Sequence, residues 1–132
     1  MSLQICIMTP DQIFFNEPAD EIILPTNTGQ MGVLANHAPL ISALDIGVML
    51  IRTQNNWQSL ALMGGFALIQ QNQVTILVNE AESAKSISKD EAELAFNEAK
   101  LKFEKAEGQK QKVEANFAFK RARARYQLVK EK

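Results

Sequence analysis

An abrupt change of composition close to residue 80 constrains this chain more than any other feature. Before it, short runs rich in β-branched and aromatic residues alternate with turn residues, whereas afterwards Ala, Glu, Lys and Gln dominate and proline is absent. The first pattern is typical of strands and the second of helices. Because 132 residues is close to the usual size of one domain, we expect a single β core with a helical appendage. The predicted division separates residues 1–84 from residues 85–132.

The first region contains closely spaced strand-like runs with no helical period between them. Turn residues such as Pro10, Pro18 and Pro25 close the early runs, and the runs cover residues 3–8, 13–15, 21–24, 47–53, 57–63, 66–69 and 74–78. This pattern predicts an antiparallel β-sandwich or barrel and not a parallel sheet. Gly64 and Gly65 interrupt an apolar run, which indicates a bulge or a close backbone approach. A phosphate-binding loop would need a GxxxxGKS or GxxxxGKT pattern, which does not follow.

The second region predicts two helices, so that the whole chain has an α+β fold. Ser88 and Glu91 form a capping-box pattern, in which each side chain can pair with the backbone amide of the other. An apolar stripe follows at helical spacing, made of Ala92, Ala95, Phe96, Ala99, Phe103 and Ala106. Gly108 is expected to break this helix, and a second one is predicted over residues 109–129. Together the two helices form a hairpin.

The second predicted helix is apolar on two sides. One side carries Val113, Phe117, Ala124 and Leu128, and the opposite side carries Ala115, Phe119, Ala122, Tyr126 and Val129. One side can pack on the first helix, but exposure of the other would lower solubility. Either the β domain of the chain or a partner protein must cover it, and an arm that can choose between the two is a switch.

Charge and cysteine content limit the possible partners and cellular compartments. Residues 1–80 contain six acidic residues and only Arg52 as a base, whereas residues 81–132 contain thirteen basic and nine acidic residues. Such a split indicates two surfaces with different partners, or simply a helical pair with solvated lysines. Cys6 is the only cysteine, so no intrachain disulfide can form, and a reducing compartment is the default. No signal peptide or membrane span is evident, so membrane association should be indirect.

The inventory of reactive residues argues against an enzyme. His37 is the only histidine, which excludes polyhistidine metal sites, and the GxSxG pattern does not occur. Asp20 and Glu21 are neighbours that a strand would point to opposite faces, so a paired acid–base site is unsupported. We therefore expect no metal and no cofactor. His37 itself is a candidate catalytic base, interface residue or hydrogen-bonded loop anchor.

A basic run at residues 120–125 is the one dense charge cluster. Nucleic acid binding, a solvated face and docking to an acidic protein segment are the three interpretations. The slightly acidic chain and the missing RNP1 and zinc-finger patterns disfavour nucleic acid. A free-standing ligand-binding sandwich is a further alternative, which would need a sizeable apolar pocket.

Several segments together resemble a known family, the ε subunits of F-type ATP synthases of the plastid and cyanobacterial kind. They read EIILPT at 21–26, GVL at 32–34, NHAPL at 36–40, ALMGGF at 61–66 and TILVNEAE at 75–82. The resemblance implies a ten-stranded sandwich with a helical hairpin, and no catalytic residues. It also implies contacts with the rotor γ subunit and the proton ring of c subunits, and no nucleic acid partner. The contact residues that it implies are Thr28, Gly29, Gln30 and Met31 at the ring, and Asn36, His37 and Pro39 near the same interfaces.

The resemblance further implies that the hairpin is a regulatory arm. Extended along γ, it would approach acidic segments of the catalytic β subunits and block ATP hydrolysis, with Arg121, Arg123, Arg125, Phe119 and Tyr126 as the expected inhibitory residues. Some relatives bind ATP at the start of the first helix through an Asp and an Arg, but Ser88 and Glu91 stand there in this chain. An anion in place of a cation repels phosphates, which argues against nucleotide sensing. The implied location is the stromal side of the chloroplast thylakoid membrane or, alternatively, the cytoplasmic side of a cyanobacterial thylakoid.

Overall fold

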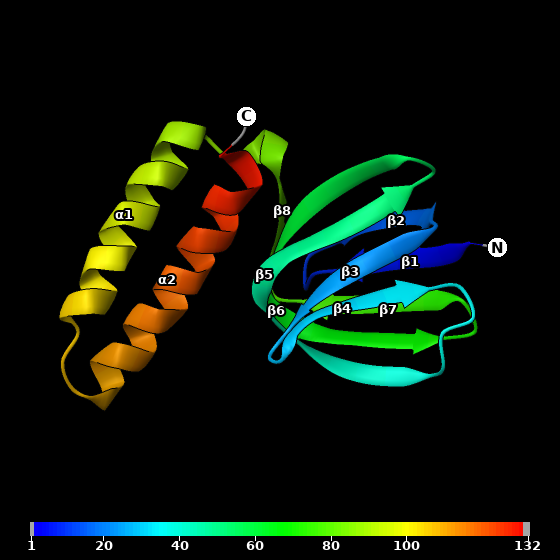
Figure 1. Ribbon diagram of the computed structural model, residues 1–132, viewed down its shortest axis with the longest axis horizontal. Helices are drawn as coiled ribbons and strands as arrows, with labels where there is room; N and C mark the ends of the chain where they lie inside the picture. The colour runs from blue at the N-terminus through cyan, green and yellow to red at the C-terminus, as the bar shows by residue number, and fades with distance from the viewer. Residues whose placement is uncertain (1, 131–132) are drawn as a thin grey trace.

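The computed structural model describes residues 2–130, which form a β domain followed by two antiparallel helices (Figure 1). The strands are β1 (Leu3–Met8), β2 (Ile13–Ala19), β3 (Glu21–Thr26), β4 (Gly29–Leu34), β5 (Leu40–Thr53), β6 (Asn56–Gln70), β7 (Gln73–Val78) and β8 (Ala81–Ser83). A 3-10 turn, η1 (Ala84–Ser86), leads into α1 (Lys89–Lys105) and α2 (Gln109–Val129). Within residues 2–130, neither helix is long and apolar enough to cross a membrane. The predicted α+β architecture is confirmed.

The eight strands form one sheet that folds over into two layers, in the order β2-β1-β7-β6-β5-β3-β4, with β8 paired to β6. All pairs are antiparallel except β1 with β7, which is parallel. This exception was not predicted, because β7 lies far from β1 in the sequence. The resemblance implied ten strands, whereas the described residues hold eight. Strand β6 runs unbroken from its pairing with β8 to its pairing with β7, and β5 follows alongside it.

The long strand β6 bends at Gly64 and Gly65, where φ is +81° and +156°. A Cβ atom at Gly65 would clash with the carbonyl oxygen of Leu77 on the neighbouring strand. The β5–β6 register skips one residue on each strand at this point. The predicted close backbone approach is therefore confirmed, and it carries β6 from one layer to the other.

Alternating apolar residues of the strands fill the space between the two layers. On β1 these are Leu3, Ile5 and Ile7, which are all fully buried, and no polar side chain is buried within residues 2–130. Burying one such side chain contributes about 1.5 to 3 kcal/mol relative to exposure. The core cluster comprises Leu3, Ile5, Ile7, Ala19, Ile22, Leu24, Val33, Leu44, Met49, Ile51, Leu60, Leu62, Ala67, Ile69, Val74, Ile76 and Val78.

The helical hairpin starts and turns where the sequence predicts. The Ser88 hydroxyl accepts a hydrogen bond from the Glu91 amide at 3.4 Å, and Gly108 precedes α2 with a φ of +77°. Phe96 of α1 stacks on both Phe119 and Tyr126 of α2, with ring centroids 5.6 and 5.2 Å apart. This face of α2 therefore packs on α1.

The opposite face of α2 lies against the β domain, so that α2 stands between α1 and the sheet (Figure 1). Ala124 is buried in a cluster with Ala61 and Met63 at the bend of β6, and Leu128 packs beside them. Of the two predicted covers for the second apolar face, the structure shows the β domain. The cover is partial, because Val113 and Phe117 near the start of α2 are 63% and 56% exposed.

Candidate protein-interaction surfaces

Basic residues of α2 form ion pairs with acidic residues of the β domain. We call this set the arm contact. Lys120 Nζ lies 3.2 Å from Asp45 Oδ2, and Arg121 Nη2 lies 3.0 Å from Glu80 Oε2. Arg125 donates through Nε and Nη2 to the two oxygens of Glu82, at 3.0 and 3.2 Å. The arm contact comprises Lys120, Arg121 and Arg125 with Asp45, Glu80 and Glu82.

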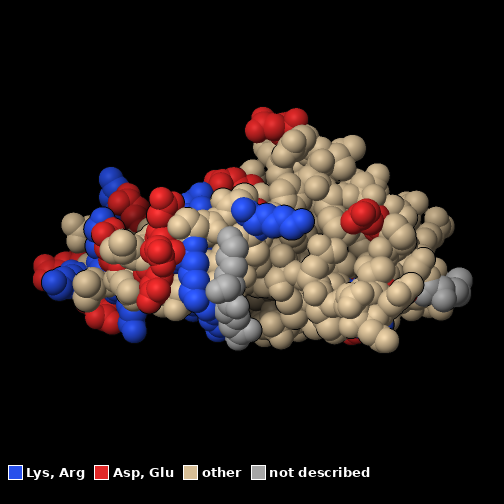
Figure 2. All heavy atoms as spheres, turned by 90° about the horizontal axis from the view of Figure 1, so that it is seen from above, with Lys and Arg blue, Asp and Glu red and all other residues tan. Residues whose placement is uncertain are grey.

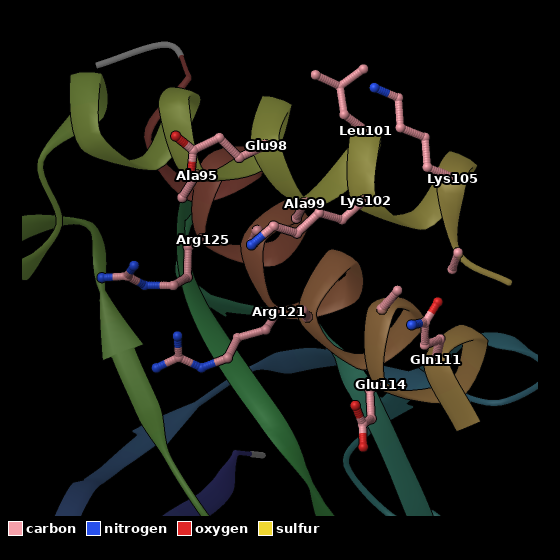
Figure 3. A pocket seen from close by; sticks show the side chains of 14 residues that line it. Ala95, Glu98, Ala99, Leu101, Lys102, Lys105, Gln111, Glu114, Arg121 and Arg125 are labelled. Atoms are coloured by element: carbon pink, nitrogen blue, oxygen red, sulfur yellow. The ribbon is translucent and has the colours of Figure 1, made fainter. Parts of the chain in front are cut away.

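Matched spacing explains why two of these pairs form side by side. Glu80 and Glu82 are two residues apart in an extended segment, which separates them by about 6.6 Å along the chain. Arg121 and Arg125 are four residues apart on a helix, a rise of about 6 Å. Both guanidinium groups reach away from α1 toward this segment (Figure 3). The sequence contains this signal, but only the fold brings the two spacings together.

The ion pairs differ in their exposure to solvent, which decides their relative strength. The Arg125 and Glu82 side chains are 27% and 18% exposed, whereas Arg121 and Glu80 are 38% and 53% exposed. Bidentate geometry and lower exposure both strengthen a charged hydrogen bond. Arg125 with Glu82 is therefore the strongest member of the arm contact.

The structure divides the residues predicted for the inhibitory arm into separate groups. Arg121 and Arg125 belong to the arm contact, while Arg123 is exposed and lies over the Phe119 ring at 5.3 Å. Phe119 and Tyr126 are stacked on Phe96 inside the hairpin. In this arrangement the two rings have apolar cover within the hairpin, and their contact with a partner stays a prediction.

A groove of about 840 Å³ runs between the two helices (Figure 3). Alanines of both helices line it, together with Lys102 and Lys105 of α1. The start of α1 packs against the end of α2, since Ile87 and Ala92 are buried together with Val129. Within residues 2–130, no group of three His, Cys, Asp or Glu side chains could hold a metal ion.

A second surface is an apolar patch on the outside of the sandwich, which we call the apolar sheet face. Phe66 and Leu77 are direct partners on β6 and β7, and Leu68 faces Ile41 of β5. Ile41, Phe66 and Leu77 are 72%, 59% and 52% exposed. Contiguous exposed apolar side chains of this kind mark protein contacts. These residues were not predicted as a site, although apolar residues on both faces of β6 were a visible signal.

Charged side chains avoid most of the sandwich seen from above and gather over the helices (Figure 2). On the β domain, Arg52 lies 3.1 Å from Glu21 and 3.9 Å from Asp20. The neighbouring acids Asp20 and Glu21 are thus partners of one arginine, and because Asp20 lies just before β3, the expected alternation along a strand does not separate them. The helices therefore offer a partner a charged surface, and the sandwich offers it a mostly uncharged one.

The two loops predicted to bind partners lie at opposite ends of β4. Thr28, Gly29 and Gln30 are exposed in or just after the β3–β4 turn, which Thr26 Oγ1 ties to the Gly29 carbonyl at 2.7 Å. Met31, predicted with them, instead packs against the core. Strand β4 separates the two loops by about 20 Å, and their contacts with partners stay a prediction.

The second loop is anchored to the β6–β7 turn. The Asn36 amide donates to Asn72 Oδ1 at 2.6 Å, and His37 Nδ1 lies 2.6 Å from the Ala38 carbonyl oxygen. Among the three roles predicted for His37, this hydrogen bond fits a loop anchor. Pro39 is exposed at the entry to β5.

Comparison with known proteins places this architecture in a class. Residues 2–84 match the family described as ATP synthase, Delta/Epsilon chain, beta-sandwich domain, and residues 85–130 match the long alpha-helix domain of the same chain. The two matches together cover almost the whole chain and define it as a subunit of the ATP synthase delta/epsilon class. The chain belongs to the epsilon subunit family of F-type ATP synthases, of the chloroplast type.

The relatives cover the chain nearly end to end. It is 74% identical to the chloroplastic ATP synthase epsilon chain of Chlorella vulgaris, over 99% of this chain and 98% of that one. Identity to the chloroplastic epsilon chain of Chlamydomonas reinhardtii is 62%, over 98% and 96%. A chain in the cryo-EM structure of the Euglena gracilis mitochondrial ATP synthase has the same fold, with a TM-score of 0.82 and 23% identity over 93% of this chain and 78% of that one.

Proposed function

We propose that this chain is a rotor subunit of the central stalk in a chloroplast ATP synthase. It transmits rotation between the catalytic head and the proton ring through γ, and its arm inhibits ATP hydrolysis. The observation that carries this proposal is the contrast between a rigid β domain with an exposed apolar sheet face and an arm held on it by ion pairs. The subunit performs no bond chemistry itself.

The apolar sheet face fits a permanent partner such as γ. Phe66 and Leu77 are held by strands on both sides, so docking them costs little conformational entropy. The exposed β3–β4 turn, with Thr28 to Gln30, is the proposed ring contact. The subunit is proposed to attach to the thylakoid membrane indirectly, through the complex on its stromal side, and the names of its chloroplastic relatives support the chloroplast as the compartment.

The arm is proposed to inhibit by leaving the sheet and extending toward acidic segments of the catalytic β subunits. Arg121 and Arg125 would then exchange their partners on the β domain for partners on β, and Arg123 would add a third charge. Phe119 and Tyr126 would leave their stacking with Phe96 only if the hairpin itself opened.

A reconstitution experiment tests this function. The full chain is added to a chloroplast ATP synthase head that has been depleted of its ε subunit. We expect binding to γ and a fall in ATP hydrolysis. A variant with Phe66→Ser and Leu77→Ser should bind about tenfold more weakly or worse, because buried aromatic anchors dominate interfaces. As a matched control, Val113→Ser changes an exposed apolar residue of the arm and should bind γ normally. Failure of the full chain to bind would contradict the proposal.

A further inference from the structure

We propose that Asp45, Glu80 and Glu82 form an acidic receptor on the β domain that competes with acidic partner segments for the same basic side chains of α2. The proposal rests on the proposed function for the identity of the partner, but the receptor itself is defined within this chain. Its consequence is that acids of the β domain, far from any catalytic site, set how readily the arm is released.

The receptor is preorganised because its acids sit on the sheet. Asp45 lies at the bend of β5, where its Oδ1 accepts the Ile46 amide at 2.8 Å. Glu82 belongs to β8, which pairs with β6, and Glu80 directly precedes β8. Because strand pairing already fixes the backbone on which these acids sit or which they adjoin, only side-chain freedom is lost when a cation arrives. The basic side chains come from one helix and arrive together.

The apolar part of the contact between α2 and the sheet is small, so the ion pairs decide how firmly the arm is held. Ala124 is the buried side chain of α2 against Ala61 and Met63, and Leu128 is partly buried there. Two bulky apolar residues of the same helix, Val113 and Phe117, stay exposed beyond the sheet. Exposed ion pairs shift an equilibrium by up to a few-fold each, and the three together by about tenfold.

We call the arm closed when α2 lies on the receptor, and engaged when it binds a partner. The two states exclude each other at Arg121 and Arg125, because a guanidinium that is paired with the receptor is not available to a partner. Removing the receptor acids therefore favours the engaged arm and strengthens inhibition. Removing the arginines weakens binding of the arm both to the receptor and to the partner, and so relieves inhibition. If α2 were only a solvated helix face, removing the acids would not change inhibition. Stronger inhibition without the acids and weaker inhibition without the arginines therefore identify the competition.

The first test measures the arm position in the full isolated chain. Fluorophores on Gln58→Cys and Gln109→Cys, in a Cys6→Ser background, report the distance between the β domain and the hairpin tip. Reversing the receptor with Glu80→Lys and Glu82→Lys should lower the ratio of closed to open arms by about tenfold or more. Adding Arg121→Glu and Arg125→Glu to this variant should restore closure, because the charges are exchanged. Circular dichroism checks that each variant is folded.

Arg123→Glu is the matched control, since this residue lies on the same turn but faces away from the receptor. It should leave the ratio of closed to open arms unchanged. An unchanged ratio in the receptor reversal, or a failure of the exchanged charges to restore it in folded protein, would overturn the receptor.

The second test measures ATP hydrolysis by the reconstituted complex with Glu80→Gln and Glu82→Gln in the chain. Provided that removal of the arm raises hydrolysis, stronger inhibition supports the competition, and unchanged or weaker inhibition overturns it. The two tests separate the failures. If the arm opens in the isolated chain while no variant of the arm, including its removal, changes hydrolysis, the receptor stands and the proposed inhibitory function falls.

Discussion

The β domain buries seventeen apolar side chains in one cluster, whereas within residues 2–130 the contact of the arm with the sheet buries three, Ala61, Met63 and Ala124, with Ile46 and Leu128 partly buried beside three ion pairs. Apolar burial of the first kind is insensitive to salt, while exposed ion pairs weaken as the Debye length falls to about 8 Å at physiological ionic strength. We therefore expect the β domain to stay folded under conditions in which the arm is released, as the proposed function requires.

Removal of residues 88–132 should have the largest effect of all on regulation and little on the β domain. We expect the shortened chain to fold and to bind γ, because the core cluster lies wholly before Ser88. Hydrolysis by the reconstituted complex should rise to the level without inhibition. Near-ultraviolet circular dichroism and co-purification with γ measure the two parts. A shortened chain that no longer binds γ would show that the regions are not separable.

Ile76→Ala should lower the free energy of unfolding of the β domain by about 2 to 5 kcal/mol, because it leaves a cavity in a fully buried site. Urea denaturation of the full chain measures the change. Ile41→Ala on the apolar sheet face is the control, and it should change the value by less than about 0.5 kcal/mol, since that side chain is 72% exposed. Similar losses for both variants would mean that the exposed face is part of the core.

Gly65→Ala should lower the free energy of unfolding by about 1 to 3 kcal/mol, because the backbone is strained for an L side chain and the new methyl group meets the Leu77 carbonyl. The β6–β7 pairing would have to shift to accommodate it. Thermal unfolding followed at a β-sheet wavelength measures the loss. Gly32→Ala is the matched control, since nothing lies within 4 Å of its added Cβ. Equal stability of both variants would contradict the bend assigned to β6.

Ser88→Ala should have the smallest effect, about 1 kcal/mol on the stability of α1, because one cap hydrogen bond is lost. Amide hydrogen exchange over the first turn of α1 should become faster, with no change over β1 and β7. Ser88→Asp keeps a side-chain acceptor at the cap and should restore slow exchange. If alanine and aspartate behave alike, the cap makes no measurable contribution.

Local features of the fold could be predicted because they depend on neighbouring residues alone. Ser88 with Glu91 indicated the start of α1, Gly108 its end, and Gly64 with Gly65 the bend of β6. The parallel pairing of β1 with β7 was missed, since pattern and propensity do not say which distant strand becomes a neighbour.

By itself the sequence determined a β domain, a helical hairpin and a second helix with two apolar sides, because strand and helix periods are written in residue order. The tertiary structure alone decided which acids meet Arg121 and Arg125 and which apolar side chains remain on the outside. Glu82 and Arg125 are 43 residues apart in the chain, and their spacing along a strand and a helix matches only after both elements have docked. Contacts of this kind depend on the relative placement of whole elements, which no local pattern encodes.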